Sequence, residues 1–219
     1  MDERIMINFA RPIALFPIRD CVLLPCAVQP LHIFEPRYRR MVRDVLDGSG
    51  LIAIARFEED VAPRETLSGR SALQEAVCIG YVEQYEMIGD GRFVILLRGV
   101  CRAAIERELE HHDPYRVADL RATEWPLVDD EKLTEQREEL RALLTDKAFD
   151  PLEDIDELRG LFDQSMSTVG LIDLLIHSAT EEAAERYAML RQTDPFVRSR
   201  WLVGRLVELR DLVRSGTWR

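Results

Sequence analysis

The chain has 219 residues, 47% of them hydrophobic, and a formal net charge of −11 at neutral pH. This length is sufficient for one large or two small domains that bury their own hydrophobic cores. The negative charge argues against a nucleic-acid ligand, because such binding depends on cationic contacts to phosphate. Neither residues 1–125 nor residues 126–219 are net basic.

The sequence contains no pattern for crossing a membrane. Its uninterrupted apolar runs are much shorter than the ~20 residues of a membrane span. The first ten residues, MDERIMINFA, lack the basic start and long apolar core of a signal peptide. We therefore expect a soluble protein in the cytoplasm, with no membrane partner.

Short apolar runs occur at Ile13, Leu15, Phe16 and Ile18 and again at Val22, Leu23 and Leu24. They are separated by Pro12, Pro17, Pro25 and Pro30. Because proline interrupts helices and is confined to the ends and edges of strands, we predict short strands at Ile13–Leu15 and Gln29–Ile33.

A helix is predicted over residues 36–47. Pro36 suits a first helical turn, where its missing N–H would have no partner, and Glu35 places negative charge at the positive end of the helix dipole. Apolar residues then recur at helical spacing, at Tyr38, Met41, Val42, Val45 and Leu46. The other side carries Arg37, Arg39, Arg40, Arg43 and Asp44. One face therefore packs and the other faces water.

A further strand is predicted at Leu51–Phe57. Residues 76–124 are predicted to form an antiparallel meander, with Tyr115–Leu120 as its last strand. Gly89-Asp90-Gly91 marks a tight turn between two strands of a hairpin, and the return strand meets Gly99, where we expect a bend or bulge. These segments predict a six-stranded antiparallel sheet. Closing that sheet into a barrel would remove its exposed edges.

After Pro126 the pattern becomes helical, so we predict an α+β protein with a sheet subdomain, residues 1–125, and a helical subdomain, residues 126–219. Asp194 and Pro195 have the form of a cap and a first-turn proline, and an apolar stripe then continues to near Gly216. This last helix is rich in arginine, whereas residues 126–163 are acidic. We expect the two to lie near one another, although exposed ion pairs contribute less than ~1 kcal/mol each.

No catalytic, cofactor or metal site is indicated. The two lysines, Lys132 and Lys147, are not preceded by glycine, so there is no phosphate-binding loop of the GxxxxGK[ST] type. No serine has a distinctive setting beside a base. Cys21 and Cys26 are five residues apart without a second pair at zinc spacing, and we expect all four cysteines to be reduced thiols.

Four segments of the sequence are similar to one known domain. They are ALFPIRDCVLLPCAVQPLHIFEPRYRRMV, GYVEQYEMIGDGRFVILLRGVCRAAI, HDPYRVADLRATEW and GLIDLLIHSATEEAAERYAMLRQTDPFVRSRWLVGRLVEL. Together they resemble the substrate-binding amino-terminal domain of Lon proteases, the LON domain, which also occurs in stand-alone and cereblon-type proteins. The chain departs from the opening motif at Cys26 and Gln29, where a glycine and an apolar residue are expected.

The resemblance implies a PUA-like pseudo-barrel followed by a C-terminal helical bundle, and a role in recognising polypeptide chains. Because the ATPase and serine–lysine peptidase modules are missing, we expect a stand-alone, non-catalytic polypeptide-binding module, an adaptor in protein quality control. Its partners would be unfolded or specific polypeptides, with a Lon-type protease as a further candidate. The expected binding residues flank an apolar groove where barrel and helices meet: Leu31, His32, Phe34, Arg37 and Tyr38.

Other hypotheses stay open at this stage. The same five residues also fit internal packing, and packing is the simpler interpretation. The arginines at positions 37, 39, 40 and 43 on a PUA-like barrel would suit RNA. A small-molecule enzyme with an unrecognised pocket is a third hypothesis, because a fold does not determine a function. The sequence does not indicate an oligomeric state.

Overall fold

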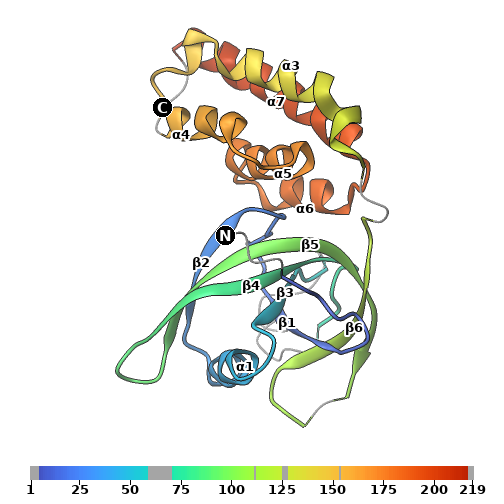
Figure 1. The fold of residues 1–219 in the computed structure, drawn as a ribbon. Helices are drawn as coiled ribbons and strands as arrows, with labels where there is room; N and C mark the ends of the chain where they lie inside the picture. Colours follow the sequence, from blue (N-terminus) through green and yellow to red (C-terminus); the bar gives the residue numbers. More distant parts are fainter. Residues whose placement is uncertain (1–4, 59–70, 111, 125–127, 153, 217–219) are drawn as a thin grey trace. The chain divides into compact units, whose positions relative to one another are not determined.

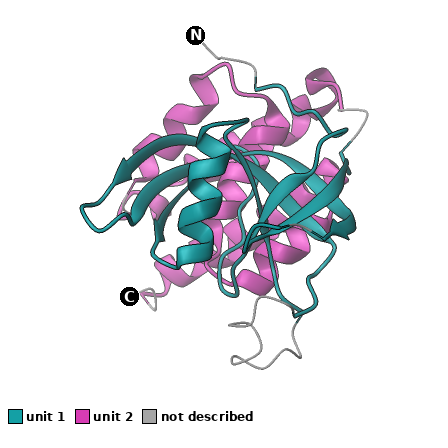
Figure 2. Cartoon of the chain, turned by 90° about the horizontal axis from the view of Figure 1, so that it is seen from below, with its two compact units in different colours: residues 1–125 teal, residues 126–219 magenta. Residues whose placement is uncertain are grey.

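The computed structural model describes residues 5–58, 71–110, 112–124, 128–152 and 154–216 (Figure 1). The chain divides into two compact units, residues 1–125 and residues 126–219, coloured separately in Figure 2. The described residues form six strands and six α-helices, so the predicted α+β class is confirmed. Each unit is taken by itself below.

Unit 1 contains all six strands and one helix. In chain order the elements are β1 (Ile13–Pro17), β2 (Val28–Ile33), α1 (Pro36–Leu46), β3 (Leu51–Ala55), β4 (Ala76–Met87), β5 (Phe93–Leu109) and β6 (Arg116–Ala122). The strand order is β2-β5-β4-β3-β1-β6, and β5 also pairs with β6. The five strands β5, β4, β3, β1 and β6 therefore close into a ring of hydrogen-bonded neighbours, with β2 added alongside β5 (Figure 1).

The prediction that the sheet is wholly antiparallel is wrong. β1 and β3 run parallel, with Ala14 opposite Ile52 and Phe16 opposite Ile54. Between them the chain passes through β2 and α1, and a long crossover that includes a helix is the connection that parallel pairing requires. Hydrophobic alternation reports which face of a strand is buried but not the direction of its neighbour, so the sequence pattern did not reveal this pairing.

The core of unit 1 lies inside the curled sheet. Its members are apolar side chains with little or no exposed surface, among them Leu15, Ala53, Val77, Ile79 and Ala118. Helix α1 begins at Pro36 as predicted, and it buries Tyr38, Met41, Val42 and Val45. The ring of Tyr38 lies 4.4 Å from the ring of Phe16 on β1, which joins the helix to the sheet.

The predicted bend at Gly99 is confirmed. The β4–β5 register shifts there, from Ile79 opposite Cys101 to Gly80 opposite Gly99. A side chain on Gly99 would overlap the carbonyl oxygen of Leu24, because the preceding loop lies directly against this strand. Two backbone hydrogen bonds hold that loop: Cys26 N donates to Gly99 O, and Gly99 N donates to Ala27 O. The glycine is therefore needed for close approach of two backbones.

Cys26 occupies a left-handed turn. Its φ is 66°, a conformation that glycine adopts without steric cost and other residues rarely adopt. The turn is thus retained although cysteine stands at the position where the resemblance leads one to expect glycine. All four cysteines are thiols, with Cys78 buried and the other three half-buried.

Unit 2 is helical throughout its described part. The α-helices are α3 (Thr134–Leu144), α4 (Ile155–Gly160), α5 (Thr168–Ala179), α6 (Ala183–Arg191) and α7 (Pro195–Arg214), with 3-10 turns η1 (Asp130–Leu133), η2 (Lys147–Phe149) and η3 (Leu161–Asp163) between them. Helix α7 packs against α5 and α3. It starts as predicted, with Asp194 Oδ1 accepting a hydrogen bond from Phe196 N at 2.8 Å.

Charged side chains tie α7 to its neighbours within unit 2. Arg214 Nη2 lies 2.6 Å from Asp146 Oδ2, which confirms at one pair the expected contact between the last helix and the acidic segment. A second pair, Arg198 Nε to Asp173 Oδ1 at 3.1 Å, joins α7 to α5, and both of these side chains are fully buried. No helix in the described residues is both long and apolar enough to span a bilayer.

Candidate functional site

Strand β2 and the residues after it place the five predicted binding residues in different settings. Phe34 is 60% exposed, and His32 is also exposed, with its ring 6.0 Å from that of Phe34. Leu31 is half-buried. β2 ends the strand order and pairs with β5, so the exposed aromatic rings lie at an edge of the sheet.

The exposed side chains of β2 continue onto β5. His32 is opposite Val94, and side chains opposite one another in an antiparallel pair lie on the same face. Residues two apart along a strand also share a face. Phe34 follows directly after the strand, and its ring contact with His32 places it beside the same face. Together these relations define one surface, the β2 apolar surface: Val28, Pro30, His32, Phe34 and Val94. All five side chains are exposed, Val28 by 43% and Val94 by 38%.

Three of the predicted binding residues do not belong to this surface. Leu31 is half-buried and opposite Ile95, so it lies on the other face of β2. Tyr38 is buried against Phe16, and burial is the main reason that the pKa of its phenol is raised. Arg37 donates from Nε to Glu35 Oε2 at 3.0 Å, and its guanidinium lies 4.6 Å from the centre of the Tyr38 ring. The interpretation as internal packing therefore holds for Tyr38, while Arg37 covers it.

The other arginines of α1 contact unit 1 itself. Arg39 donates to the carbonyl oxygens of Gly91, at 2.7 Å, and Asp90, at 2.9 Å, in the turn between β4 and β5. Arg40 Nε donates to Asp44 Oδ2 at 2.9 Å, and the guanidinium of Arg43 lies 5.8 Å from the Phe93 ring centre. The cluster that suggested RNA thus contributes to the internal contacts of the fold.

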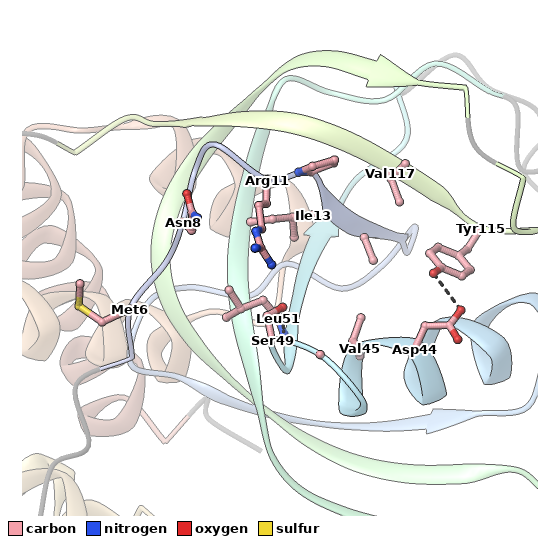
Figure 3. A pocket seen from close by; sticks show the side chains of 13 residues that line it. Met6, Asn8, Arg11, Ile13, Asp44, Val45, Ser49, Leu51, Tyr115 and Val117 are labelled. Carbon is pink, nitrogen blue, oxygen red and sulfur yellow. Dashed lines mark hydrogen bonds between the residues drawn. The ribbon is translucent and has the colours of Figure 1, made fainter.

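A pocket of about 400 Å³ opens on unit 1, formed by three segments that are distant in sequence (Figure 3). Its apolar lining includes Met6, Ile13, Val45, Leu51 and Val117. Its polar lining includes Asn8, Arg11, Asp44, Ser49 and Tyr115. The volume lies within the ~300–1,000 Å³ range of small-ligand sites.

The polar groups of the pocket are arranged at separate ends. Tyr115 Oη donates to Asp44 Oδ2 at 3.0 Å, and Figure 3 shows this pair apart from Arg11, with Val45 between them in that view. The pKa of Tyr115 is raised to about 12, first by partial burial and then by the hydrogen bond to Asp44. The phenol is therefore neutral at physiological pH and remains a donor to the carboxylate.

The described residues offer no cluster of three or more His, Cys, Asp or Glu side chains that would hold a metal ion. Asp44 is engaged by Tyr115 and by Arg40, an arrangement of a structural carboxylate rather than of one poised to transfer a proton. The two surfaces described above are suited to holding a ligand. Neither brings together a nucleophile, a base and a group that orients the base.

The sequence pattern missed several residues of these surfaces. Residues 93–97 of the sequence, FVILL, are all apolar, and in the structure Val94 is exposed while Phe93, Ile95 and Leu97 are buried. An apolar residue at an outward position was a usable signal, because such positions are polar in a simple two-faced strand. The pocket had no comparable signal, since its walls meet only in the folded chain.

The family model of the ATP-dependent protease La (LON) substrate-binding domain matches residues 12–206, so the chain belongs to the LON substrate-binding domain family. A search of curated proteins gave no match.

Solved structures support the same fold. The chain is similar to the N-terminal domain of a Mycobacterium avium complex Lon protease, with a TM-score of 0.65 and 20% sequence identity over 90% of this chain and 98% of that one. It is also similar to a Lon N-terminal domain protein from Xanthomonas campestris, with a TM-score of 0.61 and 21% identity over 89% of this chain and 98% of the other. At these identities the likeness concerns the fold.

Proposed function

We propose that this chain is a non-catalytic polypeptide-binding module that holds exposed apolar segments of unfolded or specific client proteins on the β2 apolar surface. Membership of the LON substrate-binding family supports binding of polypeptides. The single observation that carries the assignment to this surface is the grouping of Val28, Pro30, His32, Phe34 and Val94, all exposed, at the edge of the six-stranded mixed sheet.

The exposed rings and aliphatic side chains have the composition of a binding surface. A Phe side chain buries roughly 200 Å² when fully covered, and Phe34 is 60% exposed, so covering it would remove about 120 Å² of apolar area from water. At ~25 cal/mol per Å², this gives about 3 kcal/mol as an upper value. Phe34 therefore has the size and exposure of an interface hot spot.

In a cell such a module would act as an adaptor in cytoplasmic protein quality control. It would collect chains with exposed apolar segments and present them to another component, of which a Lon-type protease is one candidate. The module itself would need no ATP and no peptidase residues. The family match supports the binding part of this role, and the exposed apolar side chains of the β2 apolar surface support apolar clients.

The test is a titration of the full chain with a permanently unfolded client, reduced and carboxymethylated lactalbumin, followed by fluorescence anisotropy. Phe34→Asp should weaken binding at least tenfold, because it removes apolar area and places a charge in the contact. Tyr85→Asp is the matched control. Tyr85 is 59% exposed and lies opposite Ile95, one position from Val94, so it belongs to the other face of the sheet.

Equal affinities for the Phe34→Asp variant and the unchanged chain would refute the assignment. The RNA hypothesis makes a different forecast. Under it, the chain would be retained on an RNA column, and the double variant Arg39→Glu and Arg43→Glu would no longer be retained. Phe34→Asp would then not change the affinity for the unfolded client.

A further inference from the structure

The pocket of Figure 3 includes the side chain of Arg11, which is exposed and has no polar partner among the described residues. Within the described residues, no carboxylate lies at ion-pair distance from the Arg11 side chain, and this guanidinium makes no hydrogen bond. Its backbone is fixed, because Arg11 N donates to Asn8 O at 3.1 Å and Ala10 N donates to Asn8 Oδ1 at 3.0 Å. The turn thus holds at the edge of the pocket an arginine whose side chain has no polar partner in the part of the chain that the structure describes.

The arginine stands beside an apolar wall. Ile13, Val45 and Leu51 line the same pocket and belong to β1, α1 and β3, so this wall is built from rigid elements. Met6, at the pocket, is 87% exposed. A ligand that fills the space must therefore combine an apolar body with a group that pairs with a guanidinium.

The opposite end of the pocket sets the orientation of such a ligand. Asp44 carries a negative charge there, and its Oδ2 already accepts hydrogen bonds from Tyr115 and Arg40. A second anion next to Asp44 would be repelled, whereas one next to Arg11 would be attracted. The anionic group of the ligand is therefore expected at the Arg11 end and the neutral body toward Val45 and Asp44.

We propose that this pocket binds the carboxyl-terminal residue of a client polypeptide, with its terminal carboxylate on Arg11 and its apolar side chain against Ile13, Val45 and Leu51. A terminal Leu or Val carries both groups on one Cα atom. An internal Asp or Glu offers a carboxylate without an apolar side chain, and an internal Leu offers the reverse. This inference rests on the proposed function, since it names one class of client.

The test uses N-acetyl-Ala-Ala-Leu as the free acid and as the carboxyl-terminal amide, titrated into the full chain and followed by backbone amide NMR shifts. The acid should shift resonances of Arg11, Val45 and Leu51, and the amide should bind at least tenfold more weakly. Arg11→Gln should weaken binding of the acid at least tenfold and leave the amide unchanged, because hydrogen bonds to charged groups account for the difference. Arg11→Lys should restore part of the loss.

Two control variants distinguish loss of the Arg11 site from loss of any exposed arginine and from loss of the β2 apolar surface. Arg200→Gln removes another exposed arginine without a polar partner in the described residues, and it should not change binding of either peptide. Phe34→Asp should also leave the tripeptide acid unaffected while it weakens the unfolded client. Retained client binding with no tripeptide binding would overturn only the chain-end site, and the reverse result would overturn only the assignment of the β2 apolar surface.

Three further results would overturn the proposal. Equal affinity for acid and amide would exclude recognition of the carboxylate. An unchanged affinity of Arg11→Gln for the acid would exclude Arg11. Isovalerate binding as tightly as the tripeptide acid would show a site for small carboxylates instead of chain ends.

Discussion

His177 on α5 should make unit 2 sensitive to acid. Its Nδ1 atom is buried and makes no hydrogen bond within the described residues. Burial, with a smaller contribution from the charge of Arg186, lowers the pKa of His177 from 6.5 to about 4. The folded protein therefore holds this imidazole neutral at a pH where the unfolded chain would protonate it.

The sign and size of the effect follow from linkage. Between pH 6.5 and pH 4 the unfolded state binds more protons at this residue than the folded state, so the free energy of unfolding falls as the pH falls through that interval. One pKa unit corresponds to about 1.4 kcal/mol, so the difference between 6.5 and about 4 corresponds to roughly 3 kcal/mol. This is an upper value, because the imidazole is only half-buried.

The perturbation is His177→Leu, measured by urea unfolding at pH 7 and at pH 4. The variant should lose less stability between the two pH values than the unchanged chain, by up to about 3 kcal/mol. His112→Leu, which removes an exposed histidine, should behave like the unchanged chain. The same pH dependence in all three proteins would refute the account of His177.

Three substitutions test the packing of the fold, all by urea unfolding at pH 7. Cys26→Gly should stabilise the protein by up to about 1 kcal/mol, because glycine removes the cost of the left-handed conformation; lower stability would show that contacts of the thiol outweigh that cost. Gly99→Ala should destabilise by more than about 2 kcal/mol through overlap with Leu24, and a neutral result would mean that the loop moves away. Asp173→Asn should cost about 3–5 kcal/mol, because it leaves Arg198 buried without its countercharge, and a loss under ~1 kcal/mol would contradict a buried ion pair.

The helices were predictable because their signals are local. Pro36 and Pro195 fix the first turns, and the spacing of apolar residues after each proline reports which face is buried. The turn at Gly91 and the bend at Gly99 were also readable, since glycine is required where a φ is positive or where two backbones meet closely.

The direction of the β1–β3 pair and the composition of the surfaces depend on tertiary structure. The apolar pattern of β1 would be the same whether β1 paired with β3 in a parallel or an antiparallel direction. The parallel direction results from the long connection through β2 and α1. Tyr38 was expected both in the α1 core stripe and in the binding set, and packing on Phe16 assigned it to the core. The pocket around Arg11 joins three separate segments, which no local pattern relates to one another.

The central claim, that the β2 apolar surface holds unfolded chains, can be tested most directly by site-specific photocrosslinking. A benzophenone amino acid would replace Phe34 in one protein and Tyr85 in another, and each would be irradiated with the unfolded lactalbumin client. The account predicts crosslinked client at position 34, competed away by unlabelled client, and little at position 85. Equal crosslinking at both positions, or none at position 34, would contradict it.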